Sequence, residues 1–232
     1  MSLVKCPECG AQISDKAYSC PQCGYQNLLE KCITPLRKTW PVVLIQAKQM
    51  HVVWTYTAIC FVTTLICLTN RQMIDVLAIS GSQFELARIH TLLTYSFAHG
   101  SIVHWFFNML FLIPAGIILE PKLRSFKTLS IILAGIIATS ICYSLFGSEV
   151  PMIGSTGTVC AVLGGIVAVW VLKISHLYLI EKIGTILLVL AEGFLFIGLA
   201  STRIEAIGFL AGFLTVFILK RAGQFVIKKP QP

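Results

Sequence analysis

One stretch decides the fold of this chain: residues 97–110 read FAHGSIVHWFFNML. Within it, His104 and Asn108 are four positions apart, so their side chains share one face of a helix. The apolar residues around them continue to about residue 119, which is close to the length that a helix needs to cross a bilayer. Polar side chains in such a helix are costly unless they are hydrogen-bonded. The pair therefore predicts either a hydrogen bond to a neighbouring helix or a functional site.

Five further apolar runs accompany this one. The six runs occupy residues 52–69, 103–119, 128–147, 156–172, 183–200 and 204–219. Hydrophobic residues make up 56% of the chain and charged residues only 12%, which excludes an ordinary soluble globule. Because the runs are continuous rather than alternating, they also exclude a β-barrel. We therefore expect an all-α polytopic membrane protein, with a six-helix bundle over residues 51–222 and a cytoplasmic tail over residues 223–232.

The basic residues predict how this bundle is oriented. The net charge is +8, and fifteen of the eighteen Lys and Arg residues lie before the first run, between runs two and three, between runs four and five, or after run six. By the positive-inside rule this side is cytoplasmic, and so both termini are expected there. Because the first run follows a hydrophilic start, we expect no cleavable signal peptide, and the first span should be an uncleaved anchor. The three residues on the other side are Arg71, Arg88 and Arg203.

A separate motif lies at the amino terminus. Residues 6–10 read CPECG and residues 20–24 read CPQCG, two short turns that each present two thiols. This double spacing is typical of a tetrahedral Zn²⁺ site, and a cytoplasmic segment is too reducing for the alternative of two disulfides. We predict a zinc ribbon over residues 1–26, holding one structural Zn²⁺, and a linker over residues 27–50. The predicted ligands are Cys6, Cys9, Cys20 and Cys23.

The fourth apolar run opens with the sequence GSTG at residues 154–157 and continues with several small residues, while the sixth carries GFLAG at residues 208–212. Stripes of small residues let helices approach backbone to backbone, so we expect these two helices to touch. A helix from Thr156 to Leu172 is about 25 Å long, shorter than the ~30 Å hydrocarbon core. Its hydroxyl-bearing start is therefore expected in a cavity below the outer surface, where the free N–H groups of a helix start suit an oxyanion.

These elements resemble the rhomboid family of intramembrane serine proteases over about residues 50–222. The resemblance rests on FxHxxxxHxxxN at residues 97–108, GxxxE at 116–120, the Gly-x-hydroxyl-Gly at 154–157 and GFLAG at 208–212. It implies a six-helix bundle with a water-filled active-site cavity. The family's catalytic pair is the Ser of Gly-x-Ser-Gly and a His on helix six, and a His and an Asn on helix two help to build the oxyanion hole. The resemblance assigns His104 and Asn108 to the oxyanion group and Thr156 to the nucleophile position.

The chain departs from the family's catalytic pair at both positions. Thr156, preceded by Ser155, stands where the nucleophile is Ser, and Glu205 stands where helix six carries its His. No histidine follows His176, so no other alignment restores the base. A hydroxyl nucleophile needs a base whose pKa is near the working pH, and a carboxylate lies roughly two units below imidazole. The two substitutions predict a pseudoprotease that binds transmembrane segments or membrane proteins without cutting them.

Two alternatives remain open. The first is an active intramembrane endopeptidase that uses Ser155 or Thr156 with another base, such as His104. The second is a small transporter or channel built on Glu205 and Glu192, although the six runs show no inverted repeat. Glu192 lies within the fifth run and should face the bundle, because a lipid-facing carboxylate is costly. In all three cases the expected partners are the lipid bilayer and membrane proteins, and not nucleic acid.

Overall fold

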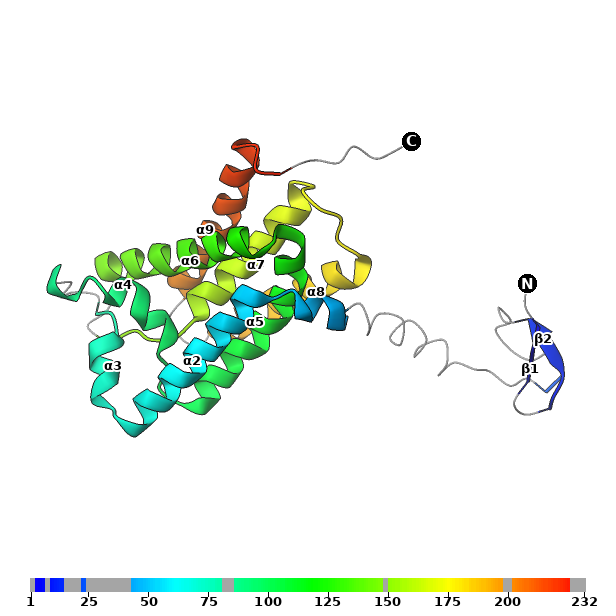
Figure 1. Cartoon of the computed structure of the whole chain (residues 1–232), viewed down its shortest axis with the longest axis horizontal. Helices are drawn as coiled ribbons and strands as arrows, with labels where there is room; N and C mark the ends of the chain where they lie inside the picture. The colour runs from blue at the N-terminus through cyan, green and yellow to red at the C-terminus, as the bar shows by residue number, and fades with distance from the viewer. Residues whose placement is uncertain are drawn as a thin grey trace. The chain divides into compact units, whose positions relative to one another are not determined.

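A computed structural model describes residues 3–6, 9–14, 22–23, 43–80, 86–147, 150–197 and 202–225. The chain divides into two compact units, Met1–Ala47 and Lys48–Pro232 (Figure 1).

The small unit contains two short antiparallel strands, β1 (Leu3–Lys5) and β2 (Gln12–Ser14), with Val4 opposite Ile13. The first cysteine turn joins them. The N–H of Gly10 donates to the carbonyl oxygen of Cys6 at 2.9 Å, and the N–H of Cys6 donates to the carbonyl oxygen of Ala11 at 2.8 Å. Gly10 has a φ of +72°, a conformation that favours glycine over residues with a Cβ. The last residue of the CPECG motif thus reverses the chain between the strands.

In the large unit, the described residues form six long helices, one over each apolar run, which confirms the predicted all-α class (Figure 1). Among the described residues, α2, α5 and α6 are long and apolar enough to cross a membrane, and α7 is a shorter apolar helix of 16 residues. The six helices are α2 (His51–Thr69), α5 (Ile102–Leu123), α6 (Ser125–Phe146), α7 (Thr156–Val171), α8 (Leu179–Ile197) and α9 (Thr202–Arg221).

Helix α7 is the centre of this unit. Most of its residues are buried, and it contacts α5, α6, α8 and α9. A Cβ added at Gly212 of α9 would lie 1.9 Å from the carbonyl oxygen of Ala161, and one at Gly208 would lie 2.5 Å from the carbonyl oxygen of Gly157. No side chain fits in so short a gap. Helices α7 and α9 therefore touch backbone to backbone, as their small residues predict.

The GxxxE motif joins α5 to the start of α2. A Cβ at Gly116 would lie 2.8 Å from a methyl carbon of Val53, so the glycine lets the two helices approach. The carboxylate of Glu120 is fully buried and accepts hydrogen bonds from the backbone N–H groups of Val52 and Val53 at 2.9 and 3.0 Å. It also accepts one from the hydroxyl of Ser125 at 2.9 Å. Because the first N–H groups of a helix have no partner within it, Glu120 caps α2 from a different part of the chain.

Short helices fill part of the connection between α2 and α5. They are α3 (Gln72–Leu77), η1 (Leu86–Arg88), α4 (Thr91–Thr94) and η2 (Tyr95–Phe97). This connection is bonded to the segment before α7: Ile79 forms a β-bridge with Met152, and the N–H of Gly154 donates to the carbonyl oxygen of Tyr95 at 3.0 Å. The connection thereby brings its last residues to the start of α7.

Candidate functional site

The chain turns sharply into α7 at Gly154. This residue has a φ of +115°, which residues with a Cβ rarely adopt. A Cβ here would also lie 2.8 Å from two atoms of the His104 imidazole. The glycine therefore does two things at once, allowing the turn and admitting the imidazole against the backbone next to Ser155 and Thr156.

Three of the predicted site residues meet at this turn. The hydroxyl of Thr156, the first residue of α7, donates to the side-chain oxygen Oδ1 of Asn108 at 3.3 Å. The side-chain Nδ2 of Asn108 donates in turn to the carbonyl oxygen of His104 at 3.0 Å. Asn108 is buried, whereas Thr156 and His104 are half-buried. The structure thus places the residue at the nucleophile position against the amide of the expected oxyanion group.

Ser155 has a different partner, which the sequence did not indicate. Its Oγ lies 3.2 Å from Nε2 of His99, and Nδ1 of His99 lies 3.3 Å from the hydroxyl of Thr64 and 3.3 Å from the carbonyl oxygen of Phe97. The side chains of Ser155, His99 and Thr64 are all fully buried. Burial, together with the nearby His104, lowers the pKa of His99 to about 3, so that its imidazole is neutral at pH 7.

The two imidazoles lie side by side but have different surroundings. The rings of His99 and His104 are 5.0 Å apart between centroids and nearly perpendicular. His99 is the imidazole that contacts Ser155, while His104 packs against Gly154. His99 belongs to the same FxHxxxxHxxxN motif as His104, which was the only signal in the sequence that pointed to it.

A cluster of three hydroxyl groups lies close to Ser155, between α2, η2 and α7. The phenol of Tyr56 is hydrogen-bonded to the hydroxyl of Ser96 and lies 3.2 Å from the hydroxyl of Thr158, and these two hydroxyls are 3.0 Å apart. All three side chains are buried. Because each one has a partner, the cluster fixes η2 and α7 to α2 without leaving an unsatisfied polar atom among these three groups.

The two acidic residues, Glu192 and Glu205, lie near each other on α8 and α9. Glu192 of α8 is only 5% exposed, as expected for a carboxylate that faces the bundle, and the thiol of Cys160 lies 4.0 Å from its Oε1. Its other oxygen, Oε2, is buried and has no hydrogen-bond partner among the described residues. Glu205, in the first turn of α9, is half-buried and lies within electrostatic range of Glu192 and Cys160.

The amino-terminal cysteines form a separate candidate metal site. The sulfur atoms of Cys6, Cys9 and Cys23 all lie within 4.8 Å of one another, and those of Cys6 and Cys23 are 3.7 Å apart. Two thiolates that each lie about 2.3 Å from a tetrahedral zinc ion are about 3.8 Å apart. These three cysteines are not disulfide-bonded, and their spacing fits a metal site. The fourth predicted ligand, Cys20, lies outside the described residues.

A bundle of apolar helices with a polar site at a buried helix start defines an integral membrane protein, with its functional groups inside the bundle. Comparison with protein families identifies which one. The model of the rhomboid domain matches residues 86–222, more than half of the chain, and the model of a zinc-ribbon domain matches residues 5–27. The chain belongs to the rhomboid family and carries an amino-terminal zinc ribbon. No match was found among curated proteins.

Proposed function

We propose that this chain is a rhomboid pseudoprotease, which holds transmembrane segments or membrane proteins in its bundle without cutting them. The observation that carries the proposal is the hydrogen bond from Thr156 to Oδ1 of Asn108. An amide oxygen accepts a hydrogen bond but is not a base that removes the proton, so the hydroxyl at the nucleophile position is not activated by its partner. Glu205 at the family's His position supports the same conclusion, because a carboxylate is a weaker base than imidazole.

Labelling with a fluorophosphonate tests this proposal on the purified full-length chain. We expect no labelling of the unmodified protein. The double variant Thr156→Ser with Glu205→His should be labelled, and each single change should do little because nucleophile and base act as a unit. A matched control combines Glu205→His with Thr215→Ser, which places the new serine on α9, away from the start of α7. Labelling or substrate cleavage by the unmodified chain that is lost in Thr156→Ala would contradict the proposal.

A second candidate is an active endopeptidase in which Ser155 is the nucleophile and His99 the base. The 3.2 Å contact between their side chains favours it, and Thr64 would orient the imidazole. Two features weigh against it: Ser155 has no exposed surface, and burial lowers the pKa of His99, which makes its imidazole a weak base at pH 7. Labelling that is lost in both Ser155→Ala and His99→Gln, but kept in Thr156→Ala, would identify this mechanism instead.

We further propose that the bound metal is Zn²⁺ and that its role is structural, because four thiolates leave no open position for chemistry. The support is the 3.7 Å separation between the sulfur atoms of Cys6 and Cys23. Elemental analysis of the purified chain should find one zinc ion per molecule, and the double variant Cys9→Ala with Cys20→Ala should lose it. The matched control is Cys142→Ala, which lies in α6 and should keep the zinc. Full retention of zinc in the double variant would rule this site out.

A further inference from the structure

The ends of five helices surround a pocket on one side of the bundle. Here α5 ends at Leu123 and α6 begins at Ser125, while α7 ends at Val171, α8 begins at Leu179 and α9 ends at Arg221. The pocket has a volume of about 800 Å³. Aromatic side chains of Trp170 and Phe225 form part of its wall. Its basic lining residues are Lys122, Arg124, Lys127, Lys173 and Lys182.

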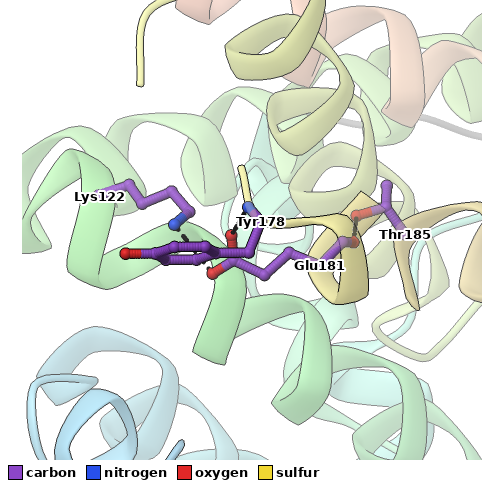
Figure 2. Close-up of polar contacts among 4 residues, drawn as sticks. All are labelled: Lys122, Tyr178, Glu181 and Thr185. Atoms are coloured by element: carbon purple, nitrogen blue, oxygen red, sulfur yellow. Dashed lines mark hydrogen bonds and ion pairs between the residues drawn. The ribbon is translucent and has the colours of Figure 1, made fainter. Parts of the chain in front are cut away.

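One of these five cations is neutralised. The ammonium of Lys122 lies 2.9 Å from the carboxylate of Glu181, and both side chains are nearly buried. The same carboxylate accepts a hydrogen bond from the backbone N–H of Tyr178 at 2.8 Å, and the carbonyl oxygen of Glu181 accepts one from the hydroxyl of Thr185 (Figure 2). Glu181 therefore caps the start of α8 and ties it to the end of α5. The negative charge of Glu181 is thus balanced by Lys122.

None of the other four cations has such a partner in the described part of the chain. Among the residues that the structure describes, no carboxylate forms an ion pair with Arg124, Lys127, Lys173 or Lys182. Two of them rest on the aromatic wall: the ammonium of Lys127 lies 4.8 Å from the ring centre of Phe225, and that of Lys182 lies 5.6 Å from the ring of Trp170. Such contacts position an ammonium group but leave its net charge in place. The pocket therefore gathers four uncompensated positive charges.

Two of these basic residues have an unusual backbone conformation. Arg124, with φ 67° and ψ 162°, and Lys173, with φ 52°, are the only residues other than glycine that have positive φ in the described part of the chain. The conformation of Arg124 is one that glycine alone adopts readily. Both residues line this pocket, although they come from different loops. A basic side chain occupies each position where glycine would be less strained.

The surface next to the pocket is apolar. Tyr178, Leu179 and Ile180, at the start of α8, are 60–74% exposed, and Phe126, near the start of α6, is 78% exposed. In a membrane protein such side chains face lipid chains rather than water. A ligand that has an anionic group in the pocket and an apolar portion along these residues satisfies both surfaces. A free anion satisfies only the first.

We propose that this pocket binds the phosphate headgroup of an anionic phospholipid, with the acyl chains lying along the exposed apolar residues of α8 and α6. Guanidinium and ammonium groups form charge-assisted hydrogen bonds with phosphate oxygens. Basic pockets between membrane helices bind the headgroups of anionic lipids in this way. The bound lipid would link five helix ends across the bundle.

Native mass spectrometry of the full-length chain in detergent tests this proposal. We expect the unmodified protein to retain phosphatidylglycerol in preference to phosphatidylcholine. The double variant Arg124→Gly with Lys173→Gly should bind phosphatidylglycerol about thirtyfold more weakly, at roughly 1 kcal/mol for each basic residue. These substitutions remove charge while relieving positive φ, so folding should be retained. Retention of the two lipids to the same extent by the unmodified chain would overturn the proposal.

Two comparisons separate this pocket from other sources of binding. The variant Lys228→Gln with Lys229→Gln removes the same charge from the tail, and it should bind phosphatidylglycerol nearly as well as the unmodified chain. An equal loss in the tail variant would show that general surface charge is responsible and would overturn the proposal. Inorganic phosphate should not displace the lipid. Displacement by it would assign the pocket to a soluble phosphate compound instead.

Discussion

Glu120 shows how much of this fold depends on a single side chain. Its carboxylate stabilises the start of α2 through two backbone N–H groups and also holds the hydroxyl of Ser125 at the start of α6. Helix α2 has no acidic residue in its own first turn and no side-chain cap. The start of the first long helix is therefore completed by a residue 67 or 68 positions away.

We predict that Glu120→Ala lowers the free energy of unfolding by about 3 kcal/mol, because it leaves two buried donors without an acceptor. Glu120→Gln should cost less, since one oxygen remains to accept a bond. The matched control Ser125→Ala removes a single hydrogen bond and should cost about 1 kcal/mol. Reversible unfolding in detergent measures all three. If Glu120→Ala cost no more than Ser125→Ala, the capping role would be wrong.

At this scale the sequence was only partly informative. It predicted that Thr156 opens a helix and that His104 and Asn108 share a face, because both depend on local spacing. It did not predict that Ser155 contacts His99, because the two are 56 positions apart. In addition, His99 follows helices too short to leave a periodic pattern, in the connection between α2 and α5. GxxxE was likewise recognisable as a motif because its spacing is local. Its capping of α2 could not be predicted, because Glu120 and the start of α2 are 67 or 68 positions apart.

At the scale of elements, α7 and α9 make the closest backbone contact found at any described glycine. Gly212 faces the carbonyl oxygen of Ala161 and Gly164 faces that of Phe209, at positions where a Cβ would lie 1.9 and 2.0 Å from oxygen. Backbone atoms cannot move aside as a flexible side chain can. The sequence predicted this contact because small residues recur on one face of each helix, a pattern that is read without knowing the fold.

We therefore predict that Gly212→Ala lowers the free energy of unfolding by about 3 kcal/mol, because α9 must move away from α7. The matched control is Gly184→Ala on α8, where an added Cβ meets nothing within 4 Å. This change should be neutral or should raise the stability by up to about 1 kcal/mol, since alanine favours a helix. Equal effects of the two changes on detergent unfolding would argue against the backbone contact.

At the scale of the whole molecule, the apolar runs predicted all six long helices because length and hydrophobicity are local properties of the sequence. The basic residues were informative only about orientation. Their positions in the sequence do not reveal that Arg124 and Lys173 line one pocket, because that depends on how α5, α6 and α7 pack. The distribution of charge along the chain thus predicted which side of the membrane the basic residues face. The structure was needed to identify the pocket that some of them share.

We predict six membrane spans with both termini on the cytoplasmic side, from the distribution of the basic residues. Single cysteines introduced as Val76→Cys and Ala222→Cys, both at exposed positions, should then lie on opposite sides of the membrane. A membrane-impermeant maleimide added to sealed vesicles should modify one of them before lysis and the other only afterwards. The unmodified chain measures the background from its own cysteines. Labelling of both positions from the same side would contradict this topology.

The burial of α7 has a consequence for the order in which the bundle exchanges its amide hydrogens with solvent. This helix is the shortest of the six and contains Gly157, Gly164 and Gly165, so its intrinsic helix propensity is poor. Yet its neighbours cover it on several sides, and its amides are reached only when those helices separate. Opening it therefore requires the free energy of global unfolding rather than that of local fraying. In deuterated buffer the helix that is weakest by itself should be the slowest to exchange.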